Sequence, residues 1–294
     1  MREVKRLLDR YYKEYNFRES ILQDPIEFPH RYKKPEDIEI AGFIASCFAY
    51  GKVGLFKPVI EKILSAMRGS PYNFLMEFKV KKDGRSETRL CELFAGIKYR
   101  FNENRDILCL LYVMGEILKK NNSLKNAFKA HYRNEDVNIG NALEGFIDYI
   151  LGIDTSEVYG KDIKPDGFLQ FFPSPMKGSA CKRMNLFLRW MIRDKDIDFG
   201  IWKGIPKNKL VIPLDTHIAR ISRCLGFTGR KANDWKTAVE ITDALKKLDP
   251  EDPLKYDFAM CHYGISGRCD SISRLCESKF TKCDKCVLKN LTYP

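Results

Sequence analysis

The sequence predicts an all-α protein, and two observations lead to this fold class. Glycine and proline are sparse, with 19 and 13 among the 294 residues. Apolar residues recur every three to four positions along most of the chain, which is the spacing of one face of a helix. We find no internal repeat and no low-complexity segment, so we expect a mostly helical chain with few or no strands.

The first half of the chain carries several separate helical patterns. The first expected helix has Val4, Leu7, Leu8 and Tyr11 on one face. Residues 38–51 are apolar on nearly all sides, which is typical of a buried helix. Further helices are expected around Val59–Leu64, Ile107–Leu118 and Leu143–Leu151. Residues 74–90 are polar and charged and are expected to be a loop or a short hairpin, and residues 152–178 are rich in glycine and proline and are expected to be a loop with turns.

The second half alternates helices with loops in the same way. A helix beginning near Ser179 has one apolar face, made of Met184, Phe187, Leu188 and Met191. A loop is expected over 194–213. Asp215 then opens a helix that Gly226 closes, and Asn233 or Asp234 caps another that ends near Leu248. The pair Asp252-Pro253 predicts a last helix start, with Asp as the cap and Pro at the first helical position.

Composition points to a globular protein with a polyanionic partner. The chain has 51 Lys and Arg against 39 Asp and Glu, a net charge of +12, and this surplus favours nucleic acid as the partner. The N-terminus runs straight into charged residues and has no apolar core of a signal peptide. The longest apolar stretch, residues 41–50, is shorter than the ~20 residues that cross a bilayer. We therefore expect a cytoplasmic protein without a membrane partner, acting as a monomer.

The segment Leu214-Asp-Thr-His-Ile-Ala-Arg-Ile221 is the most specific in the chain. On helix physics alone, Asp215 is an ordinary N-cap. The segment also closely resembles a signature of the helix-hairpin-helix DNA glycosylase superfamily, apolar-Asp-Thr-His-apolar-x-Arg-apolar. The resemblance implies that Asp215 is the catalytic carboxylate and that His217 contacts DNA. A helix N-terminus favours the ionised carboxylate, which can stabilise positive charge on the sugar as the base leaves.

The superfamily members with lyase activity place a lysine at the start of the helix that follows the hairpin. The segment Cys181-Lys-Arg-Met-Asn-Leu-Phe-Leu-Arg-Trp-Met191 is similar to that helix. The resemblance implies that Lys182 attacks the sugar C1′, expels the base and forms a Schiff base. The amine must be neutral to attack, and desolvation or the neighbouring cations Lys177 and Arg183 would favour that form. An ordinary surface lysine is the alternative, and Lys177 is the competing nucleophile.

Two features depart from the superfamily pattern. Its hairpin, Leu-Pro-Gly-apolar-Gly, is replaced by Phe172-Pro-Ser-Pro-Met-Lys-Gly178, where Gly178 is the single glycine at the expected approach of backbone to phosphate. Lys182 and Asp215 are 33 residues apart, a longer gap than in the endonuclease III branch and similar to the archaeal 8-oxoguanine glycosylase branch. The extra residues, 194–212, could bring Trp202 near the site.

The first buried helix and the chain as a whole extend the resemblance. Phe43-Ile-Ala-Ser-Cys-Phe-Ala-Tyr-Gly-Lys52 is similar to the first helix of the glycosylase core, which implies that Tyr50 and Lys52 contact DNA or the extruded base. A buried helix followed by a turn explains the same residues equally well. The chain also looks like a family of uncharacterised conserved proteins distantly related to these glycosylases. The aromatic candidates for a base pocket are Phe171, Phe172, Trp190 and Trp202.

Four cysteines crowd the C-terminal end, with the spacing Cys269-x6-Cys276-x6-Cys283-x2-Cys286. Without an export signal a metal site is the better interpretation than disulfides. Four thiolates within 18 residues can close a tetrahedral zinc site or hold a four-iron cluster. The run that begins at Gly267 resembles the start of the iron–sulfur loop of endonuclease III-type glycosylases, although the order of its gaps is reversed. We therefore favour [4Fe-4S] over zinc, in a structural role.

The resemblance implies two helical lobes with a DNA-binding cleft between them. One lobe would span residues 41–212 with the hairpin and Lys182, and the other would join residues 1–40 to 213–294 with Asp215 and the cysteine cluster. The expected activity is excision of a damaged base from double-stranded DNA, an oxidised base such as 8-oxoguanine, followed by β-elimination of the strand. The alternatives are a glycosylase without lyase activity and a non-catalytic DNA- or RNA-binding protein on the same scaffold.

Overall fold

The computed structural model describes residues 1–79, 94 and 96–265. Over these residues every regular element is helical and no strand forms; the only β pairing consists of isolated bridges, Tyr99 with Asn102 and Ser179 with Asp234. The all-α prediction is thus confirmed for the described part of the chain. None of its helices has the length and apolar content needed to cross a membrane.

The described helices range from single turns to 18 residues. In chain order they are α1 Arg2–Glu14, α2 Phe17–Ile21, the 3₁₀ turns η1 Pro25–Glu27 and η2 Pro29–Arg31, α3 Pro35–Phe48, α4 Val53–Ala66, α5 Pro71–Glu77, α7 Asn104–Asn121, α8 Leu124–Lys129, α9 Gly140–Leu151, α10 Ser156–Tyr159, α11 Asp166–Leu169, α12 Lys182–Ile192, η3 Lys207–Lys209, α13 Thr216–Cys224, α14 Trp235–Lys246 and α15 Asp257–Ile265.

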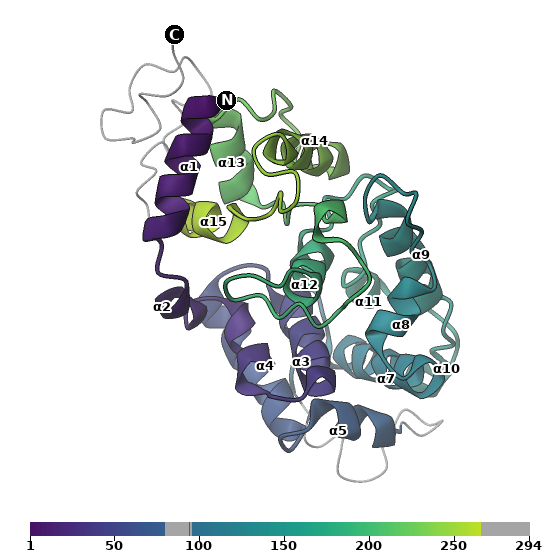
Figure 1. Cartoon of the computed structure of the whole chain (residues 1–294). Helices are drawn as coiled ribbons and strands as arrows, with labels where there is room; N and C mark the ends of the chain where they lie inside the picture. The colour runs from purple at the N-terminus through teal and green to yellow at the C-terminus, as the bar shows by residue number, and fades with distance from the viewer. Residues whose placement is uncertain (80–93, 95, 266–294) are drawn as a thin grey trace.

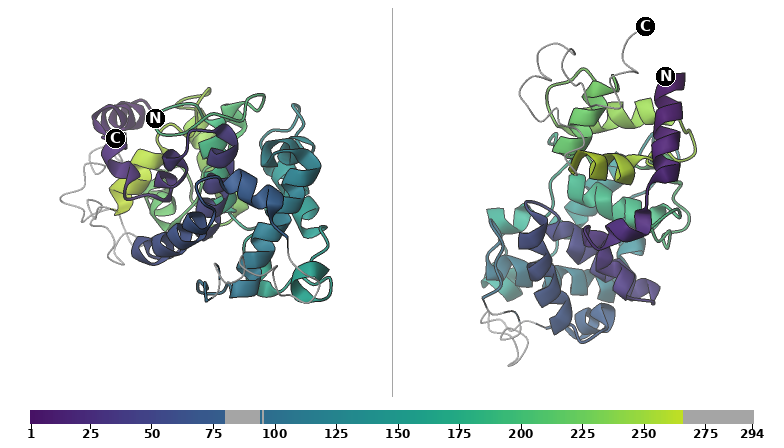
Figure 2. Two further views of the ribbon diagram at one scale, coloured as in Figure 1. Left: turned by 90° about the horizontal axis from the view of Figure 1, so that it is seen from below. Right: turned by 90° about the vertical axis from the view of Figure 1, so that its left-hand side faces the viewer.

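The helices form two groups with α12 between them (Figure 1). One group holds α1, α13, α14 and α15, and the other holds α3 to α11; the side view in Figure 2 shows the same division. The first helix joins the last ones because the Tyr11 ring packs edge-on against Tyr263 and the Tyr256 hydroxyl donates to Asp9 at 2.6 Å. Residues 25–31 pack on α3 in the central group, although the boundary drawn from the sequence places residues 1–40 in the other lobe.

Helix α3 is the centre of the larger group. Pro35 occupies its first turn beside the acidic Glu36 and Asp37, which suits a helix N-terminus, and nearly every later residue is buried. Its main neighbour is α12. The two helices approach closely at Gly42, where a Cβ atom would lie 2.9 Å from Met191 Cε. The predicted buried helix at 38–51 is confirmed, except that it ends at Phe48.

A buried ionic network joins α12 to the group of helices that holds α15. Arg189 pairs with Asp198 at 3.3 Å and also with Asp257 of α15. Arg193 pairs with Asp198 at 2.9 Å and with Asp252 at 3.0 Å. Both arginine side chains are 3% exposed. The C-terminal end of α12 is therefore held by carboxylates from the loop that follows it and from the start of α15.

The long periodic helices are where the sequence predicts them, and the short ones are not. Helices α1, α4, α7, α9, α12, α13 and α14 all overlap their predictions. Within residues 152–178, expected to be a loop with turns, the short α10 and α11 form. Pro253 begins a turn rather than a helix, and α15 starts only at Asp257. Elements of four to seven residues are too short to show a helical repeat, so periodicity does not predict them.

Candidate active site

Lys182 is the first residue of α12, and the residue before it has an unusual backbone. Cys181 has φ +49°, in the left-handed region that residues other than glycine seldom adopt. Its buried thiol donates to the Pro173 carbonyl at 3.0 Å, which ties the start of the helix to the start of the preceding turn. The start of α12 is therefore held by a contact across the turn that precedes it.

The Lys182 amine and the Arg183 guanidinium point to the C-terminal end of α3. Lys182 Nζ donates to the Ala49 carbonyl at 3.2 Å, and Arg183 donates to the Cys47 carbonyl at 2.7 Å and to the Gln170 carbonyl. Cations suit these positions because the carbonyls at a helix C-terminus carry partial negative charge. Within the described residues neither cation forms an ion pair with a carboxylate. Burial lowers the pKa of Arg183 from its ordinary value.

Asp215 is the N-cap of α13, as the sequence predicts. Its Oδ1 accepts the backbone N–H groups of His217 at 2.9 Å and Ile218 at 2.8 Å. Its Oδ2 lies 3.4 Å from the thiol of Cys261 on α15, which donates to it. The carboxylate is thus fixed by two helices, with one oxygen on the helix cap and the other on the thiol.

The thiol of Cys261 contacts Asp215 directly. Burial raises the pKa of this thiol well above its ordinary value, the charge of Asp215 raises it further, and the charge of Lys182 lowers it. Of the two predicted catalytic groups, Asp215 thus contacts the thiol and Lys182 acts on it through its charge. No pattern in the sequence singles out Cys261.

His217 packs against α15. A Cβ atom on Gly264 would lie 2.7 Å from His217 Cβ, so the absence of a side chain at Gly264 permits the close crossing of α13 and α15. The ring Nδ1 is buried and has no hydrogen-bond partner among the residues that the structure describes.

The turn that replaces the expected hairpin is contacted by a carboxylate of α9, Glu144, which the sequence did not reveal. The Glu144 side chain accepts the Ser174 hydroxyl at 2.7 Å and the Met176 backbone N–H at 3.3 Å. Lys177 and Gly178 of this turn are exposed to solvent, and Gly178 has φ +85° with open space around it. No spacing links Glu144 to this turn, so only the fold reveals the contact.

Tyr50 and Lys52 follow the end of α3, close in sequence to Ala49, whose carbonyl accepts a hydrogen bond from the Lys182 amine. The Tyr50 hydroxyl donates to Asn102 Oδ1 at 2.6 Å, and the Arg183 guanidinium lies over its ring at 4.9 Å. Burial raises the pKa of Tyr50 to about 12. Lys52 is exposed and precedes α4. Tyr50 is thus half-buried and engaged, whereas Lys52 is open to solvent.

The structure corrects the interpretation of Trp202 as a residue that contacts an extruded base. The side chain is 1% exposed, its Nε1 donates to Glu39 at 2.7 Å, and its ring packs against Phe128 and Phe187. The loop after α12 therefore inserts Trp202 into the core. The other aromatic candidates, Phe171, Phe172 and Trp190, are buried in the same way. None of the four offers a surface for a base in this structure.

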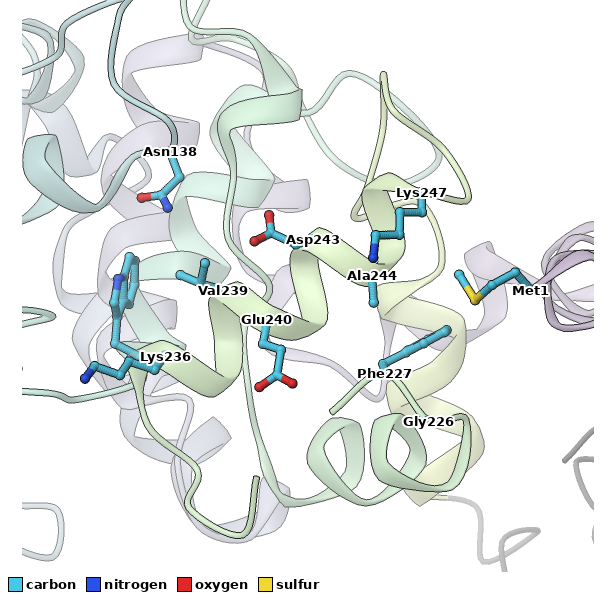
Figure 3. Close-up of a pocket in the computed structure, with 11 residues that line it drawn as sticks. Met1, Asn138, Gly226, Phe227, Lys236, Val239, Glu240, Asp243, Ala244 and Lys247 are labelled. Atoms are coloured by element: carbon cyan, nitrogen blue, oxygen red, sulfur yellow. The ribbon is translucent and has the colours of Figure 1, made fainter. Parts of the chain in front are cut away.

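The four cysteines predicted to bind a metal cluster, Cys269, Cys276, Cys283 and Cys286, lie outside the described residues. Among residues 1–79, 94 and 96–265, no group of three or more His, Cys, Asp or Glu side chains could hold a metal ion. A groove of about 630 Å³ runs along α14 between Trp235 and Lys247 (Figure 3). None of its lining residues belongs to the predicted site.

Searches of curated proteins and of solved structures return no match to this chain. One family model does match, that of the family described as "Protein of unknown function (DUF2400)". The match extends over residues 24–266 and includes Lys182, Asp215 and Cys261. By this match over most of its length, the chain belongs to the DUF2400 family.

Proposed function

We propose that this protein is a DNA glycosylase with AP lyase activity, using Lys182 as the nucleophile and Asp215 as the catalytic carboxylate. The observation that supports the proposal most is that both side chains are fixed by hydrogen bonds, Lys182 to the Ala49 carbonyl and Asp215 to the N–H groups of His217 and Ile218. Each comes from the N-terminal end of a different helix, α12 or α13. A positioned amine and a positioned carboxylate are the two groups that base excision through a Schiff base requires.

In the proposed reaction the neutral Lys182 amine attacks C1′ of the damaged nucleotide. The bond between C1′ and the base breaks, and the base leaves with the electron pair. The carboxylate of Asp215 stabilises the positive charge that develops on the sugar as this bond breaks. The nitrogen, now bonded to C1′, loses a proton and the C1′–O4′ bond breaks, with O4′ taking a proton, which gives the Schiff base. β-Elimination then removes a proton from C2′ and expels the 3′ phosphate, which breaks the strand on the 3′ side. The target base must leave the stack to reach the two groups.

The proposed substrate is double-stranded DNA with an oxidised base, and 8-oxoguanine is the first lesion to test. The net charge of +12 supports a polyanionic partner. Lys52, before α4, and Lys177, before α12, are both exposed and are the first candidates for phosphate contacts. His217 is half-buried against α15 and would act from within the site. The proposed cleft lies between the two groups of helices.

The four C-terminal cysteines are proposed to hold a [4Fe-4S] cluster, with zinc as the alternative. Four thiolates are a donor set that fits either group. The role would be structural, holding the C-terminal segment. About four iron atoms per chain with equivalent inorganic sulfide would support the cluster. One zinc atom per chain without iron would favour the alternative.

A glycosylase without lyase activity is the second candidate. The hydrogen bond from Lys182 Nζ to the Ala49 carbonyl favours it, because an ammonium held at the end of α3 is not a nucleophile. A third candidate is a non-catalytic nucleic-acid-binding protein on the same scaffold. The segment 172–178, which replaces the superfamily's hairpin and keeps a single glycine, supports it.

The test uses the purified full-length chain and duplex oligonucleotides with a single 8-oxoguanine, oxidised pyrimidine, uracil or alkylated base. We expect Lys182→Ala to abolish strand cleavage and leave the Kd for DNA within about threefold, with Lys177→Ala as the matched control. Asp215→Asn keeps a good N-cap and should slow excision about 100-fold. Strand cleavage by Lys182→Ala would refute the nucleophile assignment. Excision that leaves abasic sites intact until alkali treatment would favour the second candidate, and salt-sensitive binding without excision the third.

A further inference from the structure

Cys261 lies on α15 and contacts the N-cap of the neighbouring helix α13. Its thiol donates to Asp215, and it lies one helical turn after Asp257 on α15. The charges of Asp24, before η1, and of Lys182, at the start of α12, also act on its pKa.

We propose that Cys261 is a positioning residue that holds Oδ2 of Asp215 in the orientation needed for base excision. This inference rests on the function proposed above. Oδ1 of Asp215 is already engaged by the N–H groups of His217 and Ile218. A donor to Oδ2 adds a second restraint, because it opposes the rotation about the Cβ–Cγ bond that exchanges the two oxygens. The Cys261 thiol, at 3.4 Å, is the donor that the described structure provides.

The surroundings of the thiol keep it in the form that can donate. Burial, and then Asp215 and Asp257, raise its pKa well above the ordinary value of a cysteine, and Lys182 opposes them only in part. The group therefore stays an S–H at neutral pH and does not become a thiolate facing the carboxylate. A weak donor suits the role, because it orients the carboxylate without neutralising the charge that would stabilise the sugar.

An ordinary core cysteine is the competing explanation, and it makes different predictions. A core thiol matters for packing, so Cys261→Ser would be at least as harmful as Cys261→Ala, and every activity would decline with the folded fraction. A positioning thiol matters as a donor, so Cys261→Ser would retain function. It would also matter only in the step that needs the oriented carboxylate.

The first test measures single-turnover excision by Cys261→Ala and Cys261→Ser, with Cys224→Ala in α13 as the matched control. We expect Cys261→Ala to slow excision about tenfold, the value of a hydrogen bond to a charged group, without changing the Kd for lesion DNA. Cys261→Ser should stay within about threefold of the wild type. Borohydride trapping on a preformed abasic site should be unchanged in all three variants, because no base has to leave. Wild-type excision by Cys261→Ala, or an equal loss in Cys261→Ala and Cys261→Ser, would overturn the proposal.

A second measurement tests the contact between Cys261 and Asp215 without relying on base excision. The half-buried Cys261 is alkylated with iodoacetamide and quantified by mass spectrometry in the wild type, Asp215→Asn and Lys182→Gln. Removing the Asp215 charge should accelerate alkylation of Cys261 several-fold, and removing the Lys182 charge should slow it. Cys224 alkylation in the same samples is the internal reference. Failure of wild-type trapping would refute the proposed lyase function, whereas equal alkylation rates in the three proteins would refute the role of Cys261.

Discussion

The two ends of α12 place the same kinds of side chain in opposite surroundings. At the C-terminal end, Arg189 and Arg193 are enclosed by four carboxylates, those of Asp196, Asp198, Asp252 and Asp257. At the N-terminal end, Lys182 and Arg183 donate only to backbone carbonyls and form no ion pair within the described residues. One helix thus carries neutralised cations at one end and uncompensated cations at the other.

The difference indicates which end is structural and which end is available for chemistry. A buried arginine matched by carboxylates joins parts of a fold, and removing it leaves charges without a partner. A cation that meets only carbonyl dipoles keeps its attraction for an anion. We therefore assign a structural role to the Arg189 end of α12 and the proposed catalysis to its Lys182 end.

Removal of Arg189 should have the largest effect on stability. Arg189→Ala would leave Asp198 and Asp257 buried without one of their cations, and we expect a loss of about 3–5 kcal/mol in the free energy of unfolding. Urea denaturation followed by circular dichroism measures it. The control is Arg105→Ala, an exposed arginine of α7, for which we expect a change below about 0.5 kcal/mol. Similar losses in both variants would contradict the structural role of the C-terminal end.

The loop after α12 is anchored in the core by the hydrogen bond from Trp202 to Glu39. This carboxyl group should make the stability of the protein depend on pH. Burial raises the pKa of Glu39 to about 7, although Leu124 N–H, Lys125 N–H and the Trp202 indole donate to the carboxylate. The folded state therefore binds this proton more tightly than the unfolded state. The resulting contribution is complete below the ordinary glutamate pKa and is lost as pH rises through about 7.

The size of this effect should be about 3 kcal/mol over the whole interval. Unfolding free energies at about pH 5 and pH 8 measure it. We expect Glu39→Gln to lower the difference between the two pH values to the smaller contribution of Asp257, whose pKa burial raises to about 6. Glu36→Gln, at an exposed position of the same helix, should leave the difference unchanged. A wild-type protein that gains stability over this interval while Glu39→Gln does not would show that the sign is wrong.

Removal of Arg183 sharpens the comparison at the other end of the helix. Arg183→Ala loses hydrogen bonds to Cys47 and Gln170 but leaves no carboxylate without a partner. We therefore expect a loss of about 2 kcal/mol, clearly less than for Arg189→Ala. The same urea experiment gives the value. An equal loss for the two variants would mean that the contrast between the ends has no energetic basis.

Periodicity and capping chemistry predicted the parts of the fold that depend on local sequence. The all-round apolar run at α3, the one-sided face of α12 and the cap at Asp215 are each determined by residues within one or two turns. The start of α15 was predicted wrongly because Pro253 suits a turn as well as a first helical position.

Contacts between distant segments were beyond a single sequence. Trp202 enters the core because Glu39, 163 residues away, accepts its N–H. Cys261 reaches Asp215 across 46 residues because α13 and α15 cross at Gly264. Glu144 meets the turn before α12 in the same way. No local pattern encodes these approaches, and the C-terminal cysteine cluster and the lyase chemistry stay predictions.

Borohydride trapping on duplex DNA with an abasic site is the most direct test of the central claim, the nucleophile at the uncompensated end of α12. The wild type should form a covalent adduct with the DNA, and peptide mapping should locate it at Lys182. Lys177→Ala should trap normally and Lys182→Ala should not. An adduct that persists in Lys182→Ala, or a wild type that binds the DNA tightly and forms none, would contradict the account.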